Sequence, residues 1–218
     1  TYIPLIRMMD ALERDGVDFR LTMSITPPLC EMLASPLLQE RFTRRLGALD
    51  KAAALEVERQ AGAELAEATR FYVGELAEVR SVWERWRGRL LDAYRHHQDS
   101  GRLEVMTCGA THGYLPLILT DEARRAQIAI ACQNHERHFG RRPAGIWLPE
   151  CAYAPGLEWL LADEGIRYFF LEKHGLLHAT PSARFGTARP VLTAAGVAAF
   201  ARDPECSNQV GSAESGYP

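Results

Sequence analysis

The spacing of apolar side chains predicts a helix and then a strand at the start of the chain. Apolar residues recur at helical intervals at Tyr2, Leu5, Met9 and Leu12. Gly16 follows this run, and glycine commonly ends a helix. Residues 18–25 instead alternate polar and apolar side chains, which is typical of a half-buried strand, and the prolines within residues 26–28 end it. We therefore expect one helix before the first strand.

Residues 29–100 show no convincing strand pattern. This segment is rich in Ala, Leu, Glu and Arg and poor in proline and glycine, which predicts several helices. Acidic and basic residues are mixed along it, and such mixing is typical of a solvated helical surface. The adjacent His96 and His97 lie in this charged region, so we expect both side chains to be exposed.

Strands and helices alternate after residue 100. Short apolar runs predict strands at residues 103–108, 144–148, 166–171 and 197–201. Residues 121–139 and 156–164 lie between strands and have the character of helices. Thr120 is suited to cap the first of these helices, and Gly140 is suited to end it. This alternation is typical of an α/β protein with a parallel sheet.

The composition is that of an ordinary globular protein. Of the 218 residues, 47% are hydrophobic and 24% are charged, which excludes a disordered or fibrous chain and allows a sizeable core. The net charge of −3 argues against a general nucleic-acid or membrane-surface binder. No apolar run approaches the roughly 20 residues that cross a bilayer. We therefore predict a protein that binds neither nucleic acid nor membrane.

Two further features concern the origin of the chain. It begins at Thr1 rather than at methionine and stops in a turn-like segment at residues 216–218, so we expect both ends to be internal to a longer protein. The lack of a signal peptide is then no evidence of location. Five scattered cysteines are instead typical of a reducing compartment, and on this ground we predict a cytoplasmic protein.

Polar and aromatic residues follow each predicted strand. In parallel α/β folds, the loops at the carboxyl ends of the strands converge on one face, where ligands bind. The corresponding loops are at residues 24–28, 108–113, 147–153, 172–174 and 202–205. Because the strand bodies are apolar, this pattern predicts one polar pocket at one end of a barrel or sheet.

Glu150 is the most informative residue of these loops. It directly follows an apolar strand and stands between Trp147 and Tyr153. Aromatic rings stack on the apolar faces of sugars, and a carboxylate can attack an anomeric carbon or stabilise the positive charge that develops there. The alternative is that Glu150 caps the helix that starts near Gly156. The local pattern leaves both interpretations open.

Histidines offer weaker signals. His112 lies between Gly109 and Gly113, which let the backbone approach a ligand closely, although the imidazole can equally satisfy loop carbonyls. Cys108 and His112 lack the second pair that a zinc site requires. His135 shares a helix face with apolar residues, so we expect it to be buried. The chain also lacks a phosphate-binding glycine motif and a Gly-x-Ser-x-Gly elbow, which argues against nucleotide cofactors and serine hydrolases.

Several of these segments resemble one family. Residues 147–153 resemble the nucleophile motif of glycoside hydrolase family 57, and residues 104–116 resemble the strand and loop that precede it. Further segments are similar to the 1,4-α-glucan branching enzymes of that family, at residues 1–5, 19–24, 27–33, 200–205, 209–210 and 216–218. The resemblance therefore touches most of the chain.

The resemblance implies a fold and a reaction. The fold would be a distorted parallel (β/α)₇ barrel, incomplete here, with a helical insertion after an early strand. Residues 1–218 would be part of the catalytic barrel domain, with the helical segment of about 29–100 included. Glu150 would attack the anomeric carbon of an α-1,4-glucan such as amylose or glycogen, and the 6-hydroxyl of another glucose would accept the glycosyl group. The product would be an α-1,6 branch, as in glycogen synthesis, without a metal or organic cofactor.

The resemblance also implies roles for four other side chains. His112 would line the donor-sugar subsite, and Trp147 and Tyr153 would shape the pocket around Glu150. Arg202 matches an arginine that contacts glucan. The catalytic residue is therefore expected to be Glu150, and the substrate-binding residues His112, Trp147, Tyr153 and Arg202.

The chain departs from the family pattern in four places. It has no leading strand with a His-x-His motif, and Gly211 and Cys206 stand where tryptophan and serine are usual. The family's acid/base aspartate lies on a later strand, beyond residue 218, and neither Asp163 nor Asp203 corresponds to it. We therefore expect the parent protein to be an enzyme and this piece alone to be inactive.

Three alternatives remain open. An α-amylase or a 4-α-glucanotransferase of the same family would use the same Glu150. A non-catalytic relative would bind glucan through Trp147 and Arg202 without turnover. A metal-dependent polysaccharide deacetylase would need an aspartate and histidines around a metal, and the sequence shows no convincing cluster of this kind.

Overall fold

A computed structural model of the chain describes residues 1–213. The Gly216-Tyr217-Pro218 segment of the family resemblance lies outside the described residues. The chain divides into two compact units. The helical unit comprises Thr1–Leu21 and Leu29–Glu104, and the sheet unit comprises Thr22–Pro28 and the chain from Val105 onward.

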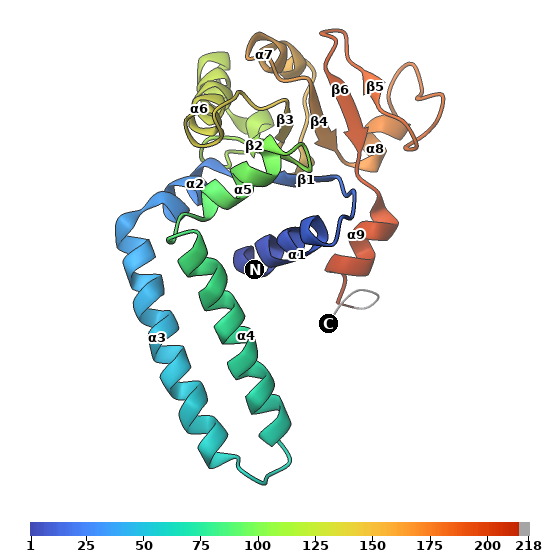
Figure 1. The fold of residues 1–218 in the computed structure, drawn as a ribbon. Helices are drawn as coiled ribbons and strands as arrows, with labels where there is room; N and C mark the ends of the chain where they lie inside the picture. Colours follow the sequence, from blue (N-terminus) through green and yellow to red (C-terminus); the bar gives the residue numbers. More distant parts are fainter. Residues whose placement is uncertain (214–218) are drawn as a thin grey trace. The chain divides into compact units, whose positions relative to one another are not determined.

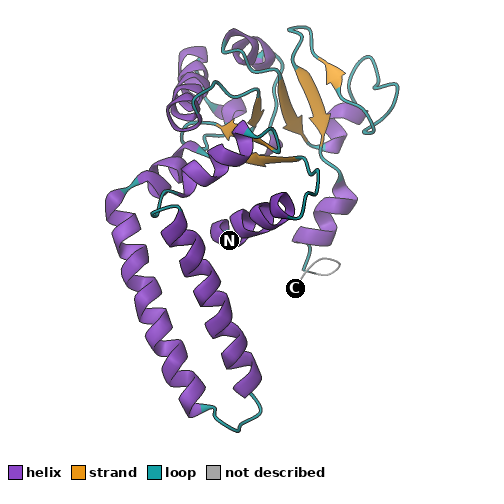
Figure 2. Ribbon diagram, in the orientation of Figure 1, coloured by secondary structure: helices purple, strands orange, loops and turns teal. Residues whose placement is uncertain are grey.

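Six strands form one mixed sheet (Figure 2). They are β1 (Leu21–Ser24), β2 (Leu103–Cys108), β3 (Gly145–Trp147), β4 (Tyr168–Leu171), β5 (Val191–Leu192) and β6 (Ala198–Ala201), in the order β1-β2-β3-β4-β6-β5. The β2/β3, β3/β4 and β4/β6 pairs are parallel, and β5/β6 is antiparallel. Over the described residues the sheet is open rather than closed into a barrel. The predicted fold class, an α/β protein with a mostly parallel sheet, is confirmed.

Helices connect the parallel strands of the sheet unit (Figure 1). Between the strands lie η1 (Leu115–Leu117), α6 (Asp121–Phe139), η2 (Pro149–Cys151), α7 (Leu157–Asp163) and α8 (Lys173–Leu177), and α9 (Pro204–Gly211) follows the last strand, β6. The predicted bounds of α6 are confirmed. The Thr120 hydroxyl accepts a hydrogen bond from the Ala123 amide at 3.3 Å, and Gly140 ends the helix at φ 74°.

One face of the sheet is buried under α6 and α7 (Figure 1). Because side chains alternate between the faces of a strand, Phe169 and Leu171 of β4 join this core while Tyr168 and Phe170 face the other way. On that second face, Phe170 lies next to Phe200 of β6, with 5.7 Å between ring centroids. We call this second side, which carries Tyr168, Phe170 and Phe200, the aromatic face of the sheet.

The helical unit contains α1 (Tyr2–Arg14), most of α2 (Pro27–Ala34), α3 (Pro36–Arg59), α4 (Ala66–Arg85) and α5 (Leu90–Asp99). The long helices α3 and α4 run side by side in opposite directions (Figure 1). Trp83 of α4 donates a hydrogen bond from Nε1 to the Thr43 hydroxyl of α3 at 3.1 Å. The helical character predicted for residues 29–100 is thus confirmed, with α2–α5 inserted between β1 and β2.

The apolar positions that predict the first helix coincide only in part with its buried residues. Ile3, Ile6 and Met9 are buried, whereas Tyr2 is 40% exposed. The start of α1 has apolar side chains on more than one side, so the spacing of its apolar residues does not determine which face is buried. Packing against α4 and α5 makes the choice, and the Tyr94 hydroxyl of α5 donates to the Tyr2 carbonyl at 3.0 Å.

Short elements at the end of the chain were not predicted. The two-residue strand β5 pairs with β6, and the short helix α8 follows β4. The signal for α9 was present in the sequence, because the Asp203 carboxylate accepts a hydrogen bond from the Cys206 amide and Pro204 occupies the first turn. Elements of two to five residues leave too few positions for periodicity to act on.

Two remaining observations concern membranes and thiols. Among the described residues, no helix combines the length and the apolar character that crossing a membrane would require. All five cysteines are free thiols, of which Cys206 is exposed and the other four are buried. Cys206 is therefore the thiol most open to modifying reagents.

Candidate active site

The candidate site lies at the carboxyl ends of the parallel strands of the sheet unit. Cys108 ends β2, Trp147 ends β3, Leu171 ends β4 and Ala201 ends β6. Because the strands run in parallel, the loops after these residues meet at the same edge of the sheet. These loops carry His112, Glu150, Glu172 and Arg202.

Glu150 stands on a strained turn directly after β3. It has φ 55° and ψ 25°, and the next residue, Cys151, has φ 52°. Side chains with a Cβ rarely adopt this left-handed conformation, which costs about 1–2 kcal/mol per residue. Pro149 and Cys151 are buried on either side, whereas the Glu150 side chain is 74% exposed. The turn therefore holds the carboxylate out of the core and open to a ligand.

Glu150 does not cap the helix that follows. The Gly156 amide at the start of α7 donates to the Glu158 carboxylate at 2.8 Å, so Glu158 takes the place that the capping interpretation gave to Glu150. Glu158 also accepts a hydrogen bond from the Tyr153 hydroxyl at 2.8 Å and is only 8% exposed. The local sequence does not single out this buried carboxylate, because one glutamate in the first turn of a helix is an ordinary pattern.

His112 lies beside Glu150. Its Nε2 atom is 3.8 Å from Glu150 Oε1, and its Nδ1 atom is 3.1 Å from the sulfur of Cys108. Burial raises the pKa of the Cys108 thiol to about 11, so the thiol keeps its proton near neutral pH and can donate to Nδ1. The other ring nitrogen, Nε2, then carries its hydrogen toward the carboxylate. The imidazole thus contacts side chains rather than the loop carbonyls of the alternative interpretation.

Gln127 of α6 holds the His112 loop in place. Its side-chain amide donates to the Thr111 hydroxyl and accepts from the Thr111 backbone amide, both at 2.9 Å. The backbone carbonyl of Gln127 also accepts a hydrogen bond from the Ala110 amide at 3.0 Å. Its contribution was not visible in the sequence, because a glutamine on a helix 16 residues from its partner carries no local signal.

A cavity of about 240 Å³ opens beside Glu150. Ten residues line it: Tyr114, Pro116, Glu150, Cys151, Ala152, Tyr153, Leu171, Glu172, His174 and Gly175. Glu172 is held by Arg202, whose Nη1 donates to Oε1 at 2.8 Å. The structure therefore brings Glu150, Tyr153 and the Arg202–Glu172 pair to one small polar hollow.

The two aromatic candidates are placed differently. The Tyr153 ring lines the cavity and stacks on Phe169, with 5.3 Å between centroids and 14° between planes. Burial, followed by its hydrogen bond to Glu158, raises the pKa of Tyr153, so the hydroxyl stays protonated. Trp147 does not line this cavity, and its ring lies 5.9 Å from that of Phe170 on the aromatic face of the sheet.

Four other residues of the sequence analysis lie elsewhere. Asp203 caps α9, and Asp163 pairs with Arg125 at 2.9 Å. His135 is buried, as predicted, and its ring nitrogens lie 2.8 and 2.9 Å from the carbonyls of Arg141 and Val105. The prediction that His97 is solvated is wrong, because its side chain is fully buried.

Comparison with known proteins gives a consistent picture. The family model described as glycosyl hydrolase family 57 matches residues 1–216. A 1,4-alpha-glucan branching enzyme from Thermococcus kodakarensis is 36% identical over the whole chain. Among solved structures, the alpha-amylase AmyC from Thermotoga maritima matches the whole chain with 44% identity and a TM-score of 0.94. A branching enzyme of the same family from Pyrococcus horikoshii matches 96% of the chain with 38% identity and a TM-score of 0.89.

These relatives are all much longer than the chain. The matches cover 36% of the Thermococcus enzyme, 42% of the Thermotoga protein and 42% of the Pyrococcus protein. The chain spans about two fifths of the proteins that it resembles.

Proposed function

Because the chain belongs to glycosyl hydrolase family 57, we propose that it is part of a 1,4-α-glucan branching enzyme. Residues 1–218, with the helical segment of about 29–100, would form part of one catalytic domain. The observation that carries this proposal is the turn that holds the exposed Glu150 carboxylate beside His112 and the cavity. The substrate would be an α-glucan such as amylose or glycogen.

Glu150 is proposed as the nucleophile of a retaining double displacement. Its carboxylate would attack the anomeric carbon of an α-1,4-linked glucose and release the rest of the chain. The 6-hydroxyl of an acceptor glucose would then displace Glu150 and create an α-1,6 branch. His112, 3.8 Å away, would orient the Glu150 carboxylate and contact the donor sugar.

A retaining mechanism needs a second carboxyl group about 5–5.5 Å from the nucleophile. Glu172 lines the same cavity but is paired with Arg202. Its Oε1 atom is already engaged by the Arg202 guanidinium, which holds this carboxylate in a binding contact rather than leaving it free for the leaving oxygen. We therefore propose that the acid/base is an aspartate of the full-length protein that lies outside residues 1–218.

Substrate binding is proposed for the residues around the nucleophile. Tyr153 lines the cavity with an aromatic surface that suits the apolar face of a sugar ring. Arg202 has a side chain that is 44% exposed and has hydrogen-bond donors available for glucan hydroxyls. Trp147 would contact sugars bound along the aromatic face rather than in the cavity itself.

The direct test of the mechanism compares two Glu-to-Gln variants of the full-length protein. Glu150→Gln removes the nucleophilic carboxylate and should lower kcat by on the order of 10³-fold or more while sparing glucan binding. Glu172→Gln loses only the ion pair that positions Arg202, so we expect a rise of several-fold in KM and a much smaller change in kcat. Retained turnover in Glu150→Gln would remove it as the nucleophile.

Activity as an α-amylase is the second candidate, favoured by the close similarity to the Thermotoga protein. Incubation with amylose separates the two reactions. Branching lowers iodine staining while releasing few new reducing ends, whereas hydrolysis lowers the stain and releases many. If the full-length wild type binds glucan but does neither, the chain belongs to a non-catalytic relative.

The cellular setting follows from the same proposal. A branching enzyme acts in glycogen synthesis, and free buried thiols are compatible with a reducing compartment. We therefore propose the cytoplasm as its location.

A further inference from the structure

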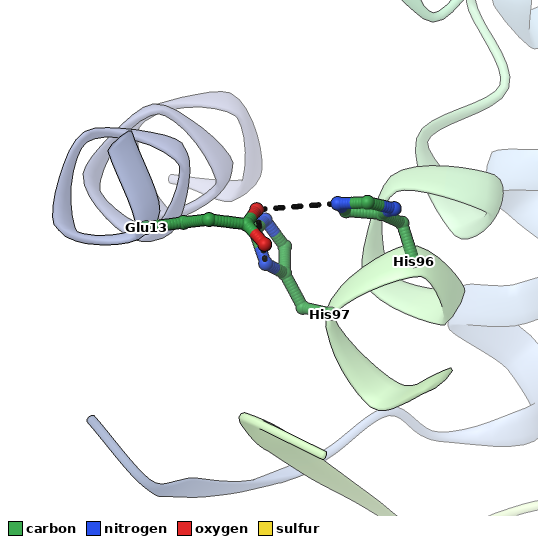
Figure 3. Close-up of side chains that lie close together, drawn as sticks. All are labelled: Glu13, His96 and His97. Atoms are coloured by element: carbon green, nitrogen blue, oxygen red, sulfur yellow. Dashed lines mark hydrogen bonds and ion pairs between the residues drawn. The ribbon is translucent and has the colours of Figure 1, made fainter. Parts of the chain in front are cut away.

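Three side chains of the helical unit form a cluster that the glucan chemistry does not use. Glu13 of α1 and the neighbours His96 and His97 of α5 point toward one another (Figure 3). One possible ligand atom from each lies within 4.8 Å of the other two. Within residues 1–213 this is the one group of three or more such residues close enough to hold a metal ion.

His97 is the most unusual member of the cluster. Its side chain is fully buried, and its Nε2 atom lies 3.0 Å from Asp10 Oδ1. The Nδ1 atom is also buried and has no hydrogen-bond partner, and it lies 3.8 Å from Glu13 Oε2. Because a carboxylate only accepts hydrogen bonds, Nε2 must carry the hydrogen, and the neutral ring then has its lone pair on Nδ1. The buried lone pair of Nδ1 therefore faces the Glu13 carboxylate oxygen, and the two repel each other. A cation between them would stabilise both.

Glu13 offers one oxygen to both histidines. Oε2 lies 3.2 Å from His96 Nε2, while Oε1 accepts a hydrogen bond from Arg102 Nη1 at 2.8 Å. Arg85 likewise pairs with Asp10, on the carboxylate oxygen that does not contact His97. The two arginines thus fix both carboxylates and leave Oε2 directed at the imidazoles.

We propose that Glu13, His96 and His97 bind a divalent transition-metal ion, Zn²⁺ in the first instance. The ligand atoms would be Glu13 Oε2, His96 Nε2 and His97 Nδ1. Two imidazoles and a carboxylate are an established ligand set for zinc, in which a water molecule completes the tetrahedron. The His96 side chain is 49% exposed and the Glu13 side chain is 30% exposed, so water and a metal ion can reach the cluster.

The observed geometry is close to what the ion requires. Ligands about 2.0–2.1 Å from zinc stand roughly 3.3 Å apart in a tetrahedron. The two imidazole nitrogens lie 3.2 and 3.8 Å from Glu13 Oε2, so only small side-chain movements are needed. Asp10 supplies the carboxylate that commonly holds a zinc-bound histidine through its second nitrogen. The bound ion would tie α1 to α5 and so stabilise the helical unit.

The test uses metal-free full-length protein and Zn²⁺ alone. Calorimetric titration of wild type should show a zinc site that His96→Ala weakens at least tenfold. His178→Ala is the matched control, because His178 is exposed and lies outside the cluster, and it should bind like wild type. Saturating Zn²⁺ should raise the Tm of wild type and of the control by several degrees, and that of His96→Ala by much less.

A second measurement keeps the proposal testable if His96→Ala folds poorly. Co²⁺ held by nitrogen and oxygen ligands in a four- or five-coordinate site absorbs visible light, and wild type should show this band and lose it on addition of Zn²⁺. The proposal is overturned if wild type and a folded His96→Ala variant give the same zinc titration curve. It is also overturned if wild type shows no cobalt band that zinc displaces. Either outcome leaves the role of Glu150 untouched, because the cluster takes no part in glucan chemistry.

Discussion

At the scale of single residues, backbone strain is concentrated at the candidate site. Four described residues other than glycine have a positive φ, namely Arg87, His112, Glu150 and Cys151. Three of these belong to the two loops that place His112 beside Glu150. Such conformations cost free energy and persist where the surrounding structure enforces them, commonly at functional sites. The strain at Glu150 aims an exposed carboxylate, and it leads to a prediction on stability.

Glu150→Gly should be more stable than Glu150→Ala by about 0.5–1 kcal/mol, because glycine adopts the left-handed conformation without a steric penalty. Neither variant should show turnover, since both lack the carboxylate. Urea denaturation of the two variants side by side measures the difference. Equal midpoints would show that the turn is not strained by its side chain.

At the scale of elements, a close approach between two strands determines the sheet at the site. Gly145 opens β3 and pairs with Tyr168 of β4. A Cβ atom at position 145 would overlap the ring of Tyr168. Only glycine therefore allows β3 and β4 to keep the register that brings the Glu150 turn to the edge of the sheet.

Gly145→Ala should lower the free energy of unfolding by about 1–3 kcal/mol, because the methyl group forces the strands or the ring apart. Gly47→Ala is the matched control, since a Cβ at that position of α3 meets nothing within 4 Å. There alanine should raise stability by about 0.5–1 kcal/mol, as expected in a helix interior. A destabilisation of the same size in both variants would contradict the steric explanation.

At the scale of the whole molecule, each unit contains a buried histidine that joins separate elements. His97 of α5 contacts Asp10 of α1 in the helical unit, and His135 of α6 contacts the Val105 carbonyl of β2 in the sheet unit. Burial lowers the pKa of both side chains below the ordinary value of about 6.5. In His135 the two carbonyl contacts act in the opposite direction, but burial outweighs them, so folding favours the neutral form of both rings.

Stability should consequently fall in mild acid. The unfolded chain binds protons at these histidines near pH 6.5, whereas the folded chain resists them until a lower pH, so stability is full above about pH 6.5 and is lost as the pH falls below it. The urea midpoint should be lower at pH 5.5 than at pH 7.5. His135→Gln cannot titrate and should reduce this pH dependence, whereas His178→Gln, at an exposed position, should preserve it. An unchanged dependence in His135→Gln would exclude His135 as a contributor.

Much of this architecture could be predicted from local patterns. The bounds of β2 and α6, the cap at Thr120 and the helical segment all depend on residues within a few positions of one another. The position of Glu150 directly after a strand was equally visible, because strand ends follow from the change between apolar and polar side chains. Local patterns are therefore sufficient to predict the α/β class and the edge of the sheet that carries the polar loops.

Which side chains contact one another depends instead on the packing of distant segments. The loop of His112 depends on Gln127, Tyr153 depends on Glu158, and the burial of His97 depends on Asp10, 87 residues away. Such contacts arise from how strands pair and helices pack, and no local pattern encodes them. The same holds for His96 and His97, whose local sequence predicts two solvated side chains. Because α1 packs on α5, the His97 ring is buried and the His96 ring is exposed, and both lie beside the Glu13 carboxylate.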